Sequence, residues 1–193
     1  MLGVVRGLQD GDNLDLSRQN IGGCSFMPNS FKTQLQKRII SSNCDQLSKI
    51  KLTIASCITT EQQLTSLRNV INSHLRIVKN LIQQSLLKTR ITEITRLFNS
   101  IHQKRVSCEV DLNDFVRKVT TGQITSTTYA HSIVQSMHRR HVIPLDRILG
   151  NAHTVIGSVV SLIHNVLGNV NLGHFFNILG NHFGGFRIPF GIA

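Results

Sequence analysis

Apolar and polar positions follow a helical period through most of this chain, and the clearest example lies near its C-terminal end. At 100° per residue, the apolar side chains of residues 144–171 all fall on one half of the helical wheel, and the polar, glycine and charged positions on the other. A β-strand would require a period of two residues. The pattern therefore predicts one long amphipathic helix, with Pro144 in its first turn and Gly173 as its stop.

The two faces of this predicted helix suggest different contacts. The large apolar side chains of one face form a candidate membrane or partner surface: Leu145, Ile148, Leu149, Val155, Ile156, Val159, Val160, Leu162, Ile163, Val166, Leu167 and Val170. A strip of small residues on the polar face would allow another helix to approach closely: Gly150, Gly157, Ser161 and Gly168. The helix could lie in a lipid interface, or several copies could associate with their apolar faces towards lipid and their Asn, Ser and His faces inward, or the apolar face could pack against the rest of the chain.

The middle of the chain is also predicted to be helical, because residues 31–106 contain neither proline nor glycine and apolar residues recur every three or four positions. Thr60 and Gln63 match a capping box, which divides this stretch into helices near 31–57 and 61–105. Its heptads are imperfect, which favours a bundle over a strict coiled coil.

Two shorter helices are predicted in residues 108–141. Asp111 would cap the first, Gly122 would stop it, and Ser126 or Thr127 would cap the second. The pair matches a DNA-binding helix-turn-helix poorly, because Lys118 stands where a small residue should pack.

Charge is distributed unevenly along the 193 residues, whose formal net charge is +11. Residues 31–107 carry a net charge of +10, whereas residues 151–193 contain a single charged side chain, Arg187. The mean hydropathy of the whole chain, +0.01, therefore averages a strongly charged region and a nearly uncharged one. A basic helical segment attracts phosphates of nucleic acid or anionic lipid, unless it is only a solvated face. The candidate phosphate contacts are Lys37, Arg38, Lys49, Lys51, Lys88, Arg90, Lys104 and Arg105.

Histidines and cysteines add little chemistry. The histidines of the C-terminal region form a candidate pH-responsive set: His153, His164, His174 and His182. The four cysteines are too sparse for a disulfide scaffold, so we expect buried thiols in a reducing compartment, although two bridges are permitted.

No signal peptide or simple transmembrane helix is evident, which predicts an intracellular, non-secreted protein or a virion component. No catalytic motif occurs and no metal-ligand spacing is convincing, so no catalytic residue, cofactor or metal is predicted.

The sequence thus predicts a mostly α protein, a helical bundle or imperfect coiled coil followed by an amphipathic C-terminal helix and an extended Gly/Phe-rich arm. Residues 1–30 are expected to form a polar arm, 31–107 a basic long-helix region, 108–141 a helical hairpin, and 142–193 the uncharged amphipathic helix with its arm. The predicted function is that of a non-enzymatic structural protein of a virion or capsid, which assembles with itself or other capsid subunits and uses its C-terminal segment on membranes. The alternatives are an oligomerisation scaffold whose C-terminal helix is packed core, and a basic accessory protein that binds nucleic acid without sequence specificity.

Overall fold

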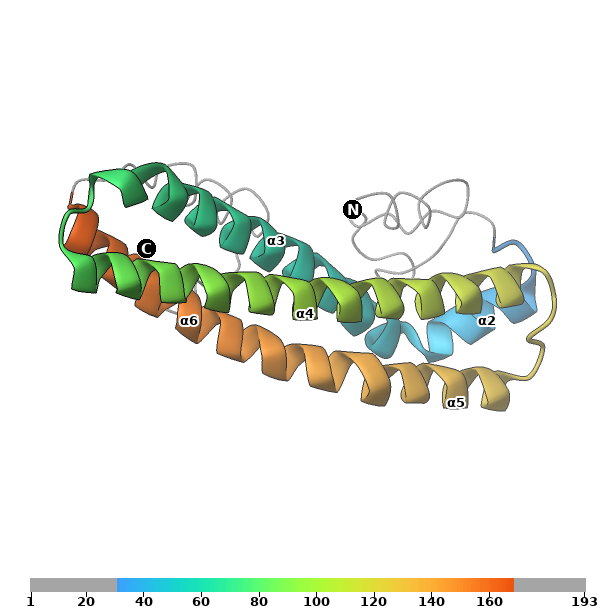
Figure 1. The fold of residues 1–193 in the computed structure, drawn as a ribbon. Helices are drawn as coiled ribbons and strands as arrows, with labels where there is room; N and C mark the ends of the chain where they lie inside the picture. Colours follow the sequence, from blue (N-terminus) through green and yellow to red (C-terminus); the bar gives the residue numbers. More distant parts are fainter. Residues whose placement is uncertain (1–30, 169–193) are drawn as a thin grey trace. The chain divides into compact units, whose positions relative to one another are not determined.

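The fold is known from a computed structural model, which describes residues 31–168. Within this range the chain is helical and contains no strand. The elements are α2 (Gln34–Ser42), α3 (Cys44–His74), the short 3₁₀ turn η1 (Leu75–Ile77), α4 (Leu81–Thr120), α5 (Thr127–Met137), the π-helical turn η2 (His138–Val142) and α6 (Ile143–Leu167), shown in chain order in Figure 1. The predicted N-terminal arm, the Gly/Phe-rich arm and Gly173 lie outside the described residues.

The chain divides into two compact units, to both of which α3, α4 and α6 contribute. Among the described residues, the first unit comprises 31–55 and 104–146, and the second comprises 56–103 and 147–168. Each unit has its own buried apolar core. In the first, the core includes Ile39, Leu47, Phe115, Val134 and Leu145.

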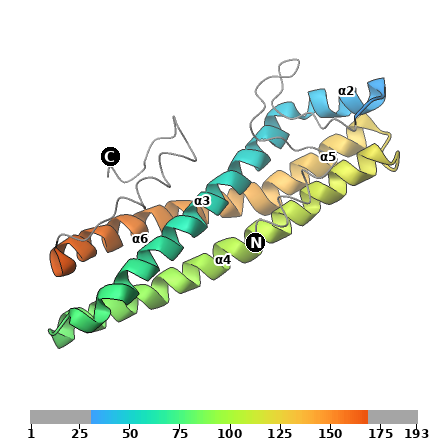
Figure 2. The same ribbon diagram turned by 90° about the horizontal axis from the view of Figure 1, so that it is seen from above.

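Polar contacts fix the helices of the first unit at both ends of α2. Thr33 and Gln36 form a capping box at its start, and the Gln36 side-chain amide also donates to the carbonyl oxygens of Val119 and Thr120 at the end of α4. At its other end, the Asn43 Oδ1 atom accepts a hydrogen bond of 3.0 Å from His131 Nδ1 of α5. The bond between Asn43 and His131 links the end of α2 to α5, which lies beside α2 in both views (Figures 1 and 2).

The second unit contains buried aliphatic residues from α3, α4 and α6, among them Leu64, Ile94 and Ile156. One buried carboxylate lies among them: Glu61 Oε1 accepts a hydrogen bond of 3.0 Å from His102 Nδ1, and the His102 ring stacks on Phe98 with centroids 5.9 Å apart. A buried carboxylate is tolerated when a partner compensates its charge, which His102 does when it is protonated.

Two predicted helix starts were wrong. Thr60 and Gln63 lie buried inside α3, which runs without interruption to His74, and Asp111 lies inside α4. The predicted helix 31–57 is interrupted at Asn43, between α2 and α3. The next break occurs at 78–80, where the Asn80 side chain accepts hydrogen bonds from the backbone amides of Ile82 and Gln83. A local capping signal is overridden when the helix continues through a core that buries all its sides.

Three other predicted boundaries were confirmed, and the predicted end of the C-terminal amphipathic helix was wrong. α4 ends before Gly122, whose φ of +80° suits glycine, and the Ser126 hydroxyl caps α5 by accepting from the Tyr129 amide. α6 begins one residue before Pro144 but ends at Leu167, earlier than predicted, because Gly168 adopts a φ of +68°.

Candidate functional site

The predicted apolar face of α6 is largely buried inside the chain. Leu145, Ile156, Val159 and Ile163 have no exposed surface, and the remaining described members of the face are buried or half-buried. Val170 lies outside the described residues. In this structure the face therefore serves as core and is not presented to lipid or to a partner.

The small-residue strip of α6 has no described helix packed on it at Gly150 or at Gly168. A Cβ atom added at Gly150 would meet nothing within 4 Å, and Gly150, Ser161 and Gly168 are exposed. The predicted close approach of another helix is thus not made at Gly150 within the described chain.

The histidines of the predicted pH-responsive set differ in environment. His153 is half-buried, and this burial lowers its pKa below the ordinary value of 6.5, whereas His164 is exposed. His174 and His182 lie outside the described residues. The set is therefore not a uniform surface in the part of the chain that the structure describes.

The candidate phosphate contacts also separate into two groups. Four are buried or paired: Lys51 and Arg105 are buried, Lys49 lies 3.5 Å from the Asp146 carboxylate, and Arg90 lies 2.8 Å from that of Glu93. The other four are exposed, and they are Lys37, Arg38, Lys88 and Lys104.

The cysteines only partly follow expectation. Cys57 and Cys108 are buried thiols, but Cys44 is disulfide-bonded, which corrects the prediction of thiols at all four positions. Cys24 lies outside the described residues. Burial raises the pKa of the Cys108 thiol to about 12, with further contributions from the charges of Glu109 and Asp111.

Among the described residues, the largest concentration of exposed apolar side chains lies where α3 ends and α4 begins. We call residues 75–88 the α3–α4 tip; it is the turn that joins these helices in Figures 1 and 2. Ile77, Leu81 and Ile82 are 69%, 76% and 74% exposed, and Leu86 is 44% exposed. Isolated exposed Leu or Ile residues need no explanation, but a group this close in sequence and structure does.

The backbone of the tip holds these side chains outward. The 3₁₀ turn η1 ends at Ile77, Val78 turns inward and is buried, and Asn80 caps the first turn of α4. The Gln84 side-chain amide donates to the Val78 carbonyl oxygen, which closes the turn. The tip is thus a defined turn with its own cap.

The charge around the tip has a single sign. No acidic residue occurs between Glu61 and Glu93, whereas Arg76, Lys79 and Lys88 are exposed within the tip itself. Sequence reasoning singled out Lys88 but missed the apolar residues, because they continue the helical periodicity of the chain and look like core. The signal that could have found them is Lys79-Asn80 between two apolar pairs, which is typical of a helix start.

No family model matches this chain, and neither the curated proteins nor the solved structures contain a match to it. Within residues 31–168, no helix has a stretch that is both long and apolar enough to cross a membrane.

Proposed function

We propose that this chain is a non-enzymatic structural protein that attaches to anionic membrane surfaces through the α3–α4 tip. The observation that carries the proposal is the combination of three strongly exposed aliphatic side chains with three exposed cations in one capped turn that lacks acidic residues. Aliphatic side chains gain free energy on entering the acyl boundary of a bilayer, and Lys and Arg gain it near anionic headgroups.

The expected magnitudes are sufficient for reversible binding. Burying an exposed Ile or Leu side chain contributes on the order of 1–2 kcal/mol. Each Lys or Arg close to an anionic leaflet contributes about 1 kcal/mol. Six such groups contribute roughly 6–9 kcal/mol before the costs of association and ordering, so the expected binding is weak and reversible, with a dissociation constant well above micromolar.

This proposal moves the membrane contact away from the position that the sequence predicts. The apolar face of α6 is occupied as core, so using it on lipid would require the helix to leave the chain, whereas the tip is already exposed. The role in a virion or capsid and the assembly with other subunits stay predictions that rest on the sequence alone.

Co-sedimentation of the full chain with vesicles tests the proposal. We expect binding to vesicles that contain phosphatidylserine and much weaker binding to pure phosphatidylcholine, with a decrease as salt rises. The double substitution Leu81→Asp/Ile82→Asp should abolish binding. The matched control is Val110→Asp/Tyr129→Asp, which alters two other exposed apolar residues, 54% and 58% exposed, by the same charge.

Two outcomes would overturn the proposal. Equal loss of binding in both double variants would show that net charge alone governs attachment. If the tip variant keeps its vesicle binding but changes from oligomer to monomer by light scattering, the tip contacts a second copy of the chain and not lipid.

A further inference from the structure

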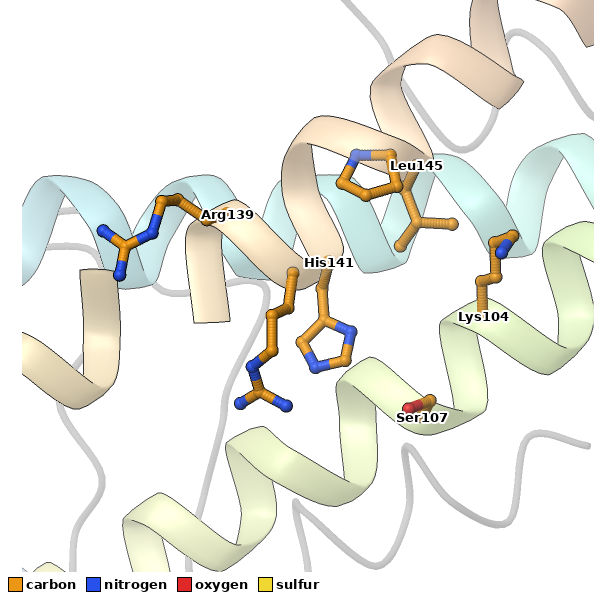
Figure 3. Close-up of a pocket in the computed structure, with 7 residues that line it drawn as sticks. Lys104, Ser107, Arg139, His141 and Leu145 are labelled. Atoms are coloured by element: carbon orange, nitrogen blue, oxygen red, sulfur yellow. The ribbon is translucent and has the colours of Figure 1, made fainter. Parts of the chain in front are cut away.

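A second basic feature lies in the first unit, around the π-helical turn η2. A cavity of about 430 Å³ is bordered by Lys104 and Ser107 of α4 and by Arg139, Arg140 and His141 of η2, with Pro144 and Leu145 of α6 as its apolar wall. In Figure 3, Arg139 lies on one side of His141 with its side chain directed away from Lys104, and Lys104 and Ser107 lie on the other side. The cavity has three cationic side chains and no carboxylate among the residues that line it.

The Asp111 carboxylate of α4 contacts two of the side chains that line this cavity. The Asp111 Oδ2 atom lies 2.6 Å from His141 Nε2 and 3.0 Å from Arg140 Nη1, and Arg140 Nε donates to the Ser136 hydroxyl at 3.1 Å. His141 is buried, and Arg140, although its side chain is 56% exposed, is bonded at two of its nitrogen atoms without any ligand. Pre-ordered donors lose less entropy on binding than mobile surface lysines do.

The charge of the site favours an anion. Asp111 offsets one of the three cations, which leaves Lys104 and Arg139, both exposed at the rim, as an excess of positive charge. A guanidinium, an ammonium and a hydroxyl together supply the donors that phosphate oxygens accept. A π-helical turn is rare in helices and occurs frequently at functional sites, where it changes the direction of consecutive side chains.

We propose that this cavity binds a phosphate group, with Lys104, Arg139 and Arg140 as its cationic contacts and Ser107 as a neutral donor. The group can come from a soluble phosphate or from the headgroup of a lipid, since both present the same oxygens. The proposal is independent of the α3–α4 tip, because it needs no bilayer and involves none of the tip's residues.

Calorimetric titration of the full chain tests this proposal with two probes. Inorganic phosphate represents the soluble source, and dihexanoyl phosphatidic acid below its micellar concentration represents the lipid source. We expect saturable binding of at least one probe, and the double substitution Lys104→Ala/Arg139→Ala should weaken it by about tenfold or more. Both residues are exposed, so the variant should fold.

The matched control removes one lysine and one arginine from elsewhere in the same unit. Lys37→Ala/Arg38→Ala changes two exposed cations of α2 by the same net charge and should leave the dissociation constant unchanged. Binding of the lipid probe alone would assign the lipid source and support the site. Absence of saturable binding for both probes, or equal weakening in both double variants, would overturn the proposal.

Discussion

The apolar face of α6 and the α3–α4 tip place similar side chains in opposite environments. Ile156 of α6 has no exposed surface, whereas Ile82 of the tip is 74% exposed. The apolar stripe of α6 is long and regular, and it forms part of the core. The apolar group at the tip is short and lies on both sides of the helix cap at Asn80. The difference shows that a perfect amphipathic pattern indicates a partner surface, and here that partner is the chain itself.

The largest expected effect comes from placing the same charged side chain in the α6 face and in the tip. Ile156→Asp should lower the free energy of unfolding by about 4 kcal/mol, because it places an uncompensated carboxylate in the core. Ile82→Asp should change it by no more than about 0.5 kcal/mol, since the side chain is exposed in the first turn of α4, where an acidic group is tolerated. Urea unfolding of both variants measures the contrast. Similar losses in the two would show that the tip is buried in solution.

A similar contrast between buried and exposed positions holds for the charged side chains of α4. Arg105 and Glu109 form a buried ion pair of 2.6 Å, next to the exposed Lys104. Arg105→Met should lower the free energy of unfolding by about 3–5 kcal/mol, because it removes an ion-pair partner from a buried carboxylate, and adding Glu109→Leu should restore most of the loss. Lys104→Met should have little effect on chemical denaturation. If the double variant is no more stable than Arg105→Met alone, groups other than Arg105 and Glu109 take part in balancing the charge in this region.

Much of the fold follows from the sequence, because helical periodicity and the absence of proline and glycine determine where helices form. Gly122 and Ser126 were recognised as boundaries because their chemistry is local. The continuity of α3 through Thr60 was not, since burial on all sides of a helix depends on tertiary packing.

The candidate sites were harder to predict than the helices. The residues of the tip resemble core residues in sequence, and only the position of the turn exposes them. The cavity at η2 depends on residues 104–107 meeting residues 139–145, a contact that no local pattern encodes.

A smaller effect is expected from His153. Burial lowers its pKa in the folded state below 6.5, so the neutral form is favoured there. The associated stability is fully present above pH 6.5 and is lost as the pH falls below that value towards the folded-state pKa. His153→Gln should reduce the acid-side loss of stability, and the exposed His164→Gln should not. Urea midpoints on both sides of pH 6.5 measure this, and identical curves for wild type and His153→Gln would contradict it.

The smallest effect concerns a thiol and leaves stability unchanged. With a pKa raised to about 12 and a buried position, Cys108 should stay protonated and resist iodoacetamide at neutral pH. Peptide mass spectrometry should detect its alkylation only after the chain is unfolded in urea. Rapid modification of the native chain at Cys108 would show that α4 opens in this region.

Hydrogen–deuterium exchange of the full chain, with and without phosphatidylserine vesicles, tests the central claim most directly. The account predicts slower exchange on vesicles in peptides that cover the α3–α4 tip, residues 75–88, and unchanged protection across α6. Faster exchange in α6 with no protection of the tip would contradict it, because the amphipathic helix would then be leaving the core to meet the membrane.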